Sequence, residues 1–129
     1  MSLIGIGTDI VAVERIERLL AKQAERFAQR LLHANEYKYF QTLPSTQQAA
    51  WLAKRFATKE AVSKALGTGI GQYVQLTEIE TRHNALGKPE LCLHGTSLLT
   101  AERLGVTEMA LTLADERRYA VAFVILIGQ

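Results

Sequence analysis

Cysteine is almost absent from this sequence. The 129 residues contain one cysteine, Cys92, which excludes an internal disulfide, and the three histidines do not fall at the spacings of a zinc site. A domain of this length buries enough apolar surface to fold without a disulfide or a structural metal. We therefore expect one domain, residues 1–129, in a reducing compartment, for which the cytoplasm is the default.

Long hydrophobic runs, linkers and a surplus of charge are missing as well. The most apolar run, residues 120–127, is far shorter than the roughly 20 residues that cross a membrane. The first residues lack the basic leader of a signal peptide. With 15 Lys and Arg against 13 Asp and Glu, the net charge of +2 gives no indication of nucleic-acid binding. The sequence therefore predicts neither a membrane span nor a nucleic-acid partner.

Apolar periodicity predicts helices and strands over most of the chain. Strands are expected at residues 3–8, 76–83, 91–94, 108–113 and 119–127, and helices at 12–32, 35–40, 45–66 and 97–104. The first helix is expected as one helix, or as two with a break near Gln23. Asn35 is the expected cap of the second helix. For the third, Ser45 and Gln48 have capping-box spacing, and Gly67 should end it. The fold class is α+β, an antiparallel sheet packed with helices.

Asp9 follows an apolar strand that contains two glycines, Gly5 and Gly7. A carboxylate at the exit of a strand suits Mg²⁺, which prefers oxygen ligands and is commonly held by one or two carboxylates and substrate phosphates. The same position would let Asp9 cap the helix that follows, because an aspartate near a helix start accepts hydrogen bonds from free N–H groups. Position alone favours the cap.

A second candidate site lies on the predicted helix at residues 45–66. Glu60 and Lys64 are four residues apart and share a face, and Arg55 and Lys59 are neighbours in the same way. A solvated ion pair, worth about 0.3–0.5 kcal/mol, is the ordinary explanation of such spacing. Here, however, the helix runs into a glycine-rich loop at residues 67–71. Cations that bind phosphate oxygens and a carboxylate that can hold a bridging metal occur together, which favours phosphate chemistry.

A basic stripe follows one side of the first predicted helix. It consists of Arg15, Arg18, Lys22, Arg26 and Arg30, at spacings of three and four residues. A solvated helix face is the usual explanation of this pattern. The alternative is docking of an acidic partner helix, because complementary charge steers encounter and sets register.

The three histidines show no helical pairing. His33, His83 and His94 form no i,i+3 or i,i+4 pair, so spacing predicts neither a metal site nor a histidine base. We expect all three to be structural or surface residues. Cys92 alternates with two leucines and is expected to be a packed strand thiol.

Five segments together resemble a known family. They are GIGTDIV at 5–11, the helix start that carries Arg15, AKRFATKEAVSKALGTGIG at 53–71, LGKPEL at 86–91 and TLADERRYAVAFVI at 112–125. In this order they resemble the bacterial holo-[acyl-carrier-protein] synthases, the small single-lobe 4′-phosphopantetheinyl transferases, over essentially the whole chain. The resemblance implies transfer of phosphopantetheine from coenzyme A to a serine of apo acyl carrier protein, with release of adenosine 3′,5′-bisphosphate, in support of fatty-acid biosynthesis.

The resemblance also implies roles for individual residues. Asp9 and Glu60 would hold Mg²⁺, and Lys64 would lie against the coenzyme A phosphates. The rest of the coenzyme A pocket would come from Arg55, Gly67, Thr68, Gly69, Lys88 and Pro89. The carrier protein would dock on Arg15, Arg18 and Lys22. Either Glu60 or a metal-held water would accept the proton of the carrier serine. Relatives of this length are homotrimers with active sites between subunits, so we expect a homotrimer here.

One position departs from the pattern of many family members. Where those carry a histidine that faces a phosphate, this chain has Asp115. A carboxylate cannot donate a hydrogen bond to a phosphate. Either another cation, Arg117 or Lys88, covers that oxygen, or Asp115 points away.

Two other classes of function stay open on the residues alone. The first is a non-catalytic adaptor, in which the basic stripe binds an acidic partner and Asp9 is only a helix cap. The second is an RNA-associated α+β domain, which the modest charge and the missing aromatic platform disfavour.

Overall fold

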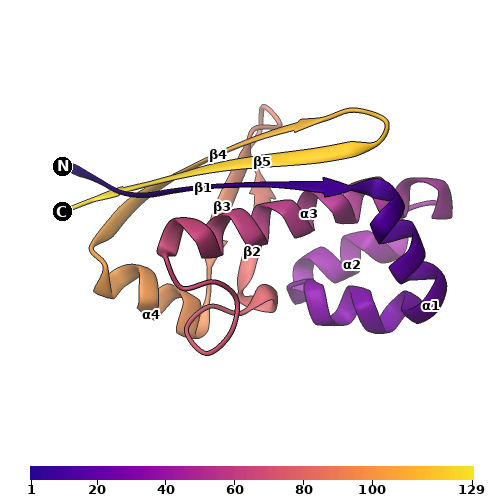
Figure 1. Ribbon diagram of the computed structural model, residues 1–129, viewed down its shortest axis with the longest axis horizontal. Helices are drawn as coiled ribbons and strands as arrows, with labels where there is room; N and C mark the ends of the chain where they lie inside the picture. The colour runs from indigo at the N-terminus through magenta and orange to yellow at the C-terminus, as the bar shows by residue number, and fades with distance from the viewer.

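The computed structural model describes residues 1–129, with the side chain at position 24 excepted. Its main sheet is antiparallel and three-stranded, with β1 (Ser2–Ala12) and β4 (Val106–Asp115) on either side of β5 (Tyr119–Gly128). The long helix α3 (Ser45–Leu66) packs along β1 and β5, and the two chain termini lie together at one end of the sheet (Figure 1). The α+β class with an antiparallel sheet is confirmed.

The remaining elements surround α3 and the sheet. Helices α1 (Val13–Leu31) and α2 (Ala34–Thr42) lie at the end of α3 away from the termini (Figure 1). After α3 come the short 3₁₀ helix η1 (Leu76–Glu78) and a separate hairpin of β2 (Ile79–His83) and β3 (Pro89–Leu93). Helix α4 (Gly95–Arg103) then leads into β4. In this order α3 becomes the central element, contacted by the main sheet on one side and by α1 on another.

Two glycines let β1 approach α3 closely. A Cβ atom built on Gly5 would lie 2.0 Å from the carbonyl oxygen of Ala65, and one on Gly7 would lie 1.9 Å from that of Ala61. No side chain fits at such distances, so strand and helix touch backbone to backbone. This contact places the residues after Gly7 directly against the second half of α3.

The structure corrects the expected bounds of the first strand. β1 extends to Ala12, four residues beyond the expected end, because residues 9–12 pair in register with residues 119–122 of β5. Asp9 therefore lies inside the strand, opposite Ala122. The expectation that Asp9 could cap the next helix is wrong, since Ala12 occupies the N-cap position of α1.

Helix boundaries agree with the sequence except at the caps. α1 is continuous through Gln23. The cap of α2 is His33, whose ring accepts a hydrogen bond from the Asn35 amide in a capping box with Glu36, so the expected cap at Asn35 is wrong. The expected Ser45–Gln48 capping box is also wrong, because Pro44 precedes α3 at the N-cap. Gly67 ends α3 in the left-handed conformation (φ 80°), as predicted.

Candidate active site

Asp9 and Lys64 meet across the contact between β1 and α3. Lys64 Nζ lies 3.1 Å from Asp9 Oδ1 and donates a second hydrogen bond, of 3.0 Å, to the carbonyl oxygen of Thr8. The Asp9 side chain is 17% exposed, whereas that of Lys64 is 53% exposed. A carboxylate supplied by the strand is thus held at a solvent-facing edge by a cation supplied by the helix.

Glu60 completes this cluster, one helical turn before Lys64. Burial raises the pKa of Glu60 above its usual value, and the nearby carboxylate of Asp9 raises it further. The positive charges of Lys64 and Arg15 oppose that shift without cancelling it. Two neighbouring carboxylates at a solvent-facing edge form a natural site for a divalent cation with oxygen ligands.

Arg15 connects this carboxylate cluster to the basic face of α1. Its guanidinium carbon lies 5.2 Å from the ring centroid of Phe56 on α3, and its charge acts on Glu60. Arg18 and Lys22 are exposed further along α1, where Arg18 pairs with Glu14 at 2.6 Å. The basic stripe therefore begins beside the carboxylates rather than on a separate part of the surface.

The opposite face of α3 carries a second, buried group of charges. Lys59 is 1% exposed, and its Nζ donates to Glu36 Oε1 at 2.7 Å and to the carbonyl oxygens of Leu76, at 2.9 Å, and Ile79. Burial lowers the pKa of Lys59, and the charge of Glu36 opposes that shift. The Glu36 carboxylate also accepts the amide of Thr81, so it joins α2, α3 and β2.

Arg55 belongs to this buried group and not to the Asp9 cluster. Its Nε lies 3.2 Å from Glu36 Oε2, without the alignment of a hydrogen bond, and its guanidinium stacks 4.4 Å from the ring centroid of Trp51. Burial lowers the pKa of Arg55, and the charge of Glu36 again opposes the shift. The expected site residues are thus divided between two faces of α3.

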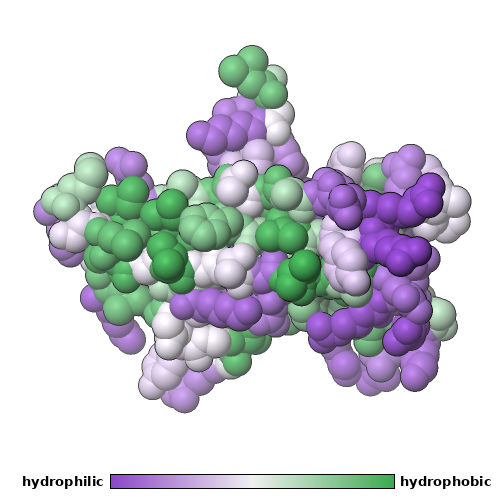
Figure 2. Space-filling view, turned by 45° about the horizontal axis from the view of Figure 1, so that its top comes forward, coloured by the Kyte–Doolittle hydropathy of each residue, from purple (hydrophilic) through white to green (hydrophobic). Residues whose placement is uncertain are grey.

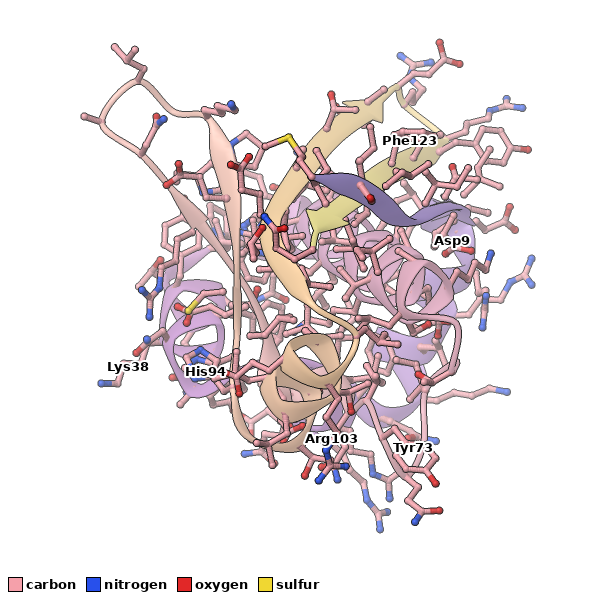
Figure 3. All side chains as sticks on the ribbon, turned by 90° about the vertical axis from the view of Figure 1, so that its left-hand side faces the viewer. Asp9, Lys38, Tyr73, His94, Arg103 and Phe123 are labelled. Carbon is pink, nitrogen blue, oxygen red and sulfur yellow. The ribbon has the colours of Figure 1, made fainter. Side chains whose placement is uncertain are left out.

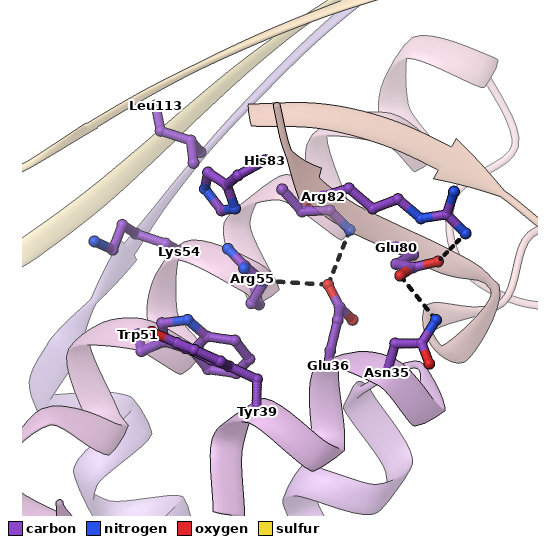
Figure 4. Close-up of a pocket in the computed structure, with 11 residues that line it drawn as sticks. Asn35, Glu36, Tyr39, Trp51, Lys54, Arg55, Glu80, Arg82, His83 and Leu113 are labelled. Atoms are coloured by element: carbon purple, nitrogen blue, oxygen red, sulfur yellow. Dashed lines mark hydrogen bonds and ion pairs between the residues drawn. The ribbon is translucent and has the colours of Figure 1, made fainter. Parts of the chain in front are cut away.

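A pocket of about 780 Å³ opens in front of Arg55 (Figure 4). Its lining combines aromatic rings with cationic side chains and comes mainly from α2, α3 and β2: Tyr39, Trp51, Lys54, Arg55, Arg82 and His83 are among the residues. Flat rings suit a heterocyclic base, and several cations suit phosphate oxygens. The pocket can therefore accept a phosphorylated nucleoside.

Comparison with known proteins bears on the chemistry of these two sites. The family model of the 4′-phosphopantetheinyl transferase superfamily matches residues 5–124 of the chain. The chain belongs to this superfamily. A holo-[acyl-carrier-protein] synthase of Halorhodospira halophila is 55% identical over 123 residues, covering 95% of this chain and 96% of that protein.

Solved structures of the superfamily share the fold. The chain matches a holo-[acyl-carrier-protein] synthase from Neisseria meningitidis with a TM-score of 0.91 and 40% identity, covering 98% of this chain and 99% of the other. A second synthase, from Bacillus anthracis in complex with CoA (3′,5′-ADP), matches with a TM-score of 0.82 and 35% identity, covering 98% of each chain. The interpretation of the chain as a phosphopantetheinyl transferase of the holo-[acyl-carrier-protein] synthase type is confirmed.

The position at which this superfamily member departs from the expected histidine lies beside a cation. Asp115 Oδ2 lies 3.6 Å from Nζ of Lys54, a residue that also lines the 780 Å³ pocket. Arg117 and Lys88 stay the predicted cations for the phosphate oxygen, and the pairing of Asp115 with Lys54 was not expected from the sequence. No local spacing could have indicated it, because Lys54 and Asp115 lie on elements far apart in the sequence.

The remaining expected pocket residues lie on two loops. The amides of Thr68 and Gly69 both donate to the carbonyl oxygen of Ser63, and that of Gly67 donates to Lys64 O, so these three N–H groups close the end of α3. Lys88 is exposed at the end of the β2–β3 turn, where its amide donates to the Asn84 side chain, and Pro89 begins β3.

Among the helices of the described residues, none is both long and apolar enough to cross a membrane.

Proposed function

We propose that this chain transfers 4′-phosphopantetheine from coenzyme A to a serine hydroxyl of apo acyl carrier protein, as part of fatty-acid biosynthesis. The observation that carries the proposal is the meeting of Asp9, Glu60 and Lys64 at the contact between β1 and α3. Membership of the superfamily supplies the reaction class. The adaptor hypothesis loses one of its premises, since Asp9 is a strand residue and not a helix cap.

The carboxylates of Asp9 and Glu60 fit Mg²⁺ as the metal. Burial raises the pKa of Glu60, and the nearby Asp9 carboxylate raises it further, which supports a shared site. When bound, Mg²⁺ would neutralise these charges and polarise the phosphate oxygens of coenzyme A. Lys64 would then be released from Asp9 to contact the same phosphates.

In the transfer step, the serine Oγ forms a bond to the β-phosphorus of coenzyme A while the bond from that phosphorus to the bridging oxygen breaks. The leaving group is adenosine 3′,5′-bisphosphate, which takes the electron pair of the broken bond. Either Glu60 or a water held by the metal would accept the serine proton. The Lys64 ammonium would stabilise charge on the leaving phosphate.

The pocket in front of Arg55 is our proposed seat for the phosphorylated adenosine of coenzyme A. The stack of Arg55 on Trp51 and the partly exposed Lys54 offer a flat surface and positive charge. Lys88 and Pro89, at the end of the β2–β3 turn, are proposed to border the same ligand. Gly67, Thr68 and Gly69 would contribute through loop shape, because their amides are already bonded within the chain.

A homotrimer is proposed for the assembled enzyme. The face of the main sheet opposite α3 exposes Ile6 (56%), Ile10 (63%) and Phe123 (39%). Figure 2 shows apolar surface gathered near the chain termini and hydrophilic surface toward the opposite end. An exposed apolar sheet face of this kind is typical of a protein–protein interface. Because Arg55 and Glu60 lie on different faces of α3, we propose that each active site combines the carboxylates of one copy with the pocket of another.

The carrier protein is proposed to dock on the basic face of α1. Arg15 lies beside Glu60, and Arg18 and Lys22 extend its charge outward. An acidic helix on this surface would bring its adjoining serine toward the carboxylates.

We propose one transferase domain over residues 1–129. From its single free thiol we also propose the cytoplasm as its compartment.

Intact-mass spectrometry of apo acyl carrier protein tests the proposed reaction. The carrier is incubated with this protein, coenzyme A and Mg²⁺, and the expected result is a gain of one phosphopantetheine. The gain should disappear with EDTA and in Asp9→Ala, and persist in Glu102→Gln, a control at an exposed residue of α4. No gain while the carrier still binds would refute the transferase and favour the adaptor.

A further inference from the structure

Two histidines that the sequence separates by about sixty residues stack on each other. The rings of His33, at the start of α2, and His94, at the start of α4, lie 4.4 Å apart between centroids with an angle of 18° between their planes. Both rings turn a nitrogen toward the carboxylate of Glu80 on β2. Sequence spacing predicts only structural or surface histidines and cannot reveal this cluster, because its members come from three elements.

The donor atoms of this cluster are spaced as a metal site requires. His94 Nε2 lies 2.9 Å and His33 Nδ1 lies 3.7 Å from Glu80 Oε1, and the three atoms all fall within 4.8 Å of one another. In a tetrahedral Zn²⁺ site with bonds of about 2.0–2.1 Å, neighbouring ligand atoms are about 3.4 Å apart. The two observed distances lie on either side of that value. Because the rings stack within 18° of parallel, one imidazole must turn out of the stack to bring both nitrogens onto one ion.

Glu80 supplies a permanent negative charge at the centre. Burial alone would raise its pKa, but hydrogen bonds from Arg82, His94 and Asn35 outweigh burial and lower the pKa to about 2. Its side chain is 4% exposed, while that of Arg82 is 55% exposed. A metal ion on Glu80 Oε1 would replace the 3.2 Å contact of that oxygen with Arg82 Nη2.

We propose that His33, Glu80 and His94 form a binding site for a divalent transition-metal ion of the Zn²⁺ class. Two imidazoles and one carboxylate are a donor set that suits Zn²⁺ or Co²⁺ and is poor for Mg²⁺, which prefers oxygen. A water molecule would complete four-coordination. Metal binding would replace the hydrogen bond that His33 Nδ1 accepts from the Asn35 amide.

This site is distinct from the Asp9–Glu60 cluster. Figure 3 shows His94 and Asp9 on opposite sides of the molecule. A metal at the histidines would tie the start of α2, strand β2 and the start of α4 to each other. Its effect is therefore expected on the stability of the fold and, because Glu80 and Arg82 also line the 780 Å³ pocket, on the ligand affinity of that pocket.

Titration of the untagged full-length chain with Co²⁺, in excess Mg²⁺, tests the site directly. The excess Mg²⁺ keeps the Asp9–Glu60 cluster filled. We expect one Co²⁺ per chain with the visible absorption of a tetrahedral complex, displacement by Zn²⁺, and a rise in melting temperature with Zn²⁺. In His33→Asn and in His94→Asn the affinity should fall at least about tenfold. Asparagine at position 33 retains a good helix cap, so this variant removes the ligand and preserves α2.

Two controls separate this site from other sources of metal binding. His83→Asn removes the remaining histidine, which lies at the end of β2 outside the cluster, and should leave Co²⁺ affinity unchanged. Asp9→Ala should also leave it unchanged, even though it abolishes the proposed transfer. The proposal is overturned if Co²⁺ fails to bind, if binding survives in both His33→Asn and His94→Asn, or if it is lost in His83→Asn.

Discussion

The two faces of α3 use the same residue types for different purposes. On the face toward α2 and β2, Lys59 and Arg55 share the carboxylate of Glu36, and all three are buried. On the face toward β1, Glu60 and Lys64 meet Asp9 at a solvent-accessible edge. The first group has one carboxylate for two cations, whereas the second brings two carboxylates together.

This difference separates a structural network from a reactive site. Buried charges persist only when they are paired, and Lys59 has three acceptors around its ammonium group. At the Asp9 cluster two carboxylates face one lysine, and the proposed metal would relieve the excess negative charge. The two faces use the same residue types and differ in net charge, which is positive in the Glu36 group and negative in the Asp9 cluster.

The largest effect is expected from Glu36→Ala, which breaks the buried network. It would leave Lys59 and Arg55 without their shared partner, and we expect a loss of about 3–5 kcal/mol in the free energy of unfolding. Chemical denaturation at fixed protein concentration measures it. Glu14→Ala is the matched control, since Glu14 forms an exposed pair with Arg18 and should change stability by about 0.5 kcal/mol or less. Equal losses of unfolding free energy in Glu36→Ala and Glu14→Ala would contradict the structural role of the buried network.

Gly7→Ala should have the next largest effect. The added methyl would collide with the Ala61 carbonyl oxygen and push β1 from α3, at a cost of about 1–3 kcal/mol. Because Asp9 moves with the strand, Mg²⁺ affinity should fall as well. Thr8→Ser, which retains the hydroxyl bonded to Ala122 O, should preserve both properties. Normal Mg²⁺ affinity in folded Gly7→Ala would show that the backbone contact does not position Asp9.

Lys64→Met should change activity much more than stability. The ammonium is half exposed, so its pair with Asp9 should contribute about 0–1 kcal/mol to folding. As a stabiliser of the leaving phosphate it should matter by about 10²–10³-fold in kcat. Rates of carrier modification and unfolding curves on the same preparation would test this. A large loss of stability with normal turnover would place Lys64 in the structural network instead.

The smallest effect is a pH dependence of stabilisation by Mg²⁺. Since the pKa of Glu60 is raised in the folded protein, its contribution to stability is present at low pH and is lost as pH rises through that pKa. Mg²⁺ should restore stability at higher pH, so its effect on melting temperature should be greater at pH 8 than at pH 5. Asp9→Asn should lower the pKa of Glu60. An Mg²⁺ effect independent of pH would refute the coupling of the two carboxylates.

Much of the fold could be predicted from the sequence. The predictions that were wrong have local causes. Periodicity found α3 and the terminal hairpin because their apolar patterns are long. β1 was predicted too short, since Asp9 resembles a strand end, whereas pairing with β5 carries the strand to Ala12. His33 was missed as a cap because histidine is an uncommon residue at that position.

The candidate site was predicted in part. Motifs singled out Asp9, Glu60 and Lys64, and the structure brings them together. Spacing also grouped Arg55 with Lys59 correctly, but it could not reveal that both turn inward. Their partner Glu36 lies about twenty residues earlier, and only the packing of α2 against α3 makes that pairing visible.

The bare contact of Gly5 and Gly7 with α3 has a consequence for redesign. Side chains of the proposed carrier-docking surface can be exchanged without changing the spacing of β1 and α3, because that spacing is fixed by direct contact between the two backbones. Mutant libraries should therefore leave positions 5 and 7 as glycine and draw their diversity from the exposed residues of α1. Variants in such libraries would differ in the surface of α1 and would all retain the same distance between β1 and α3.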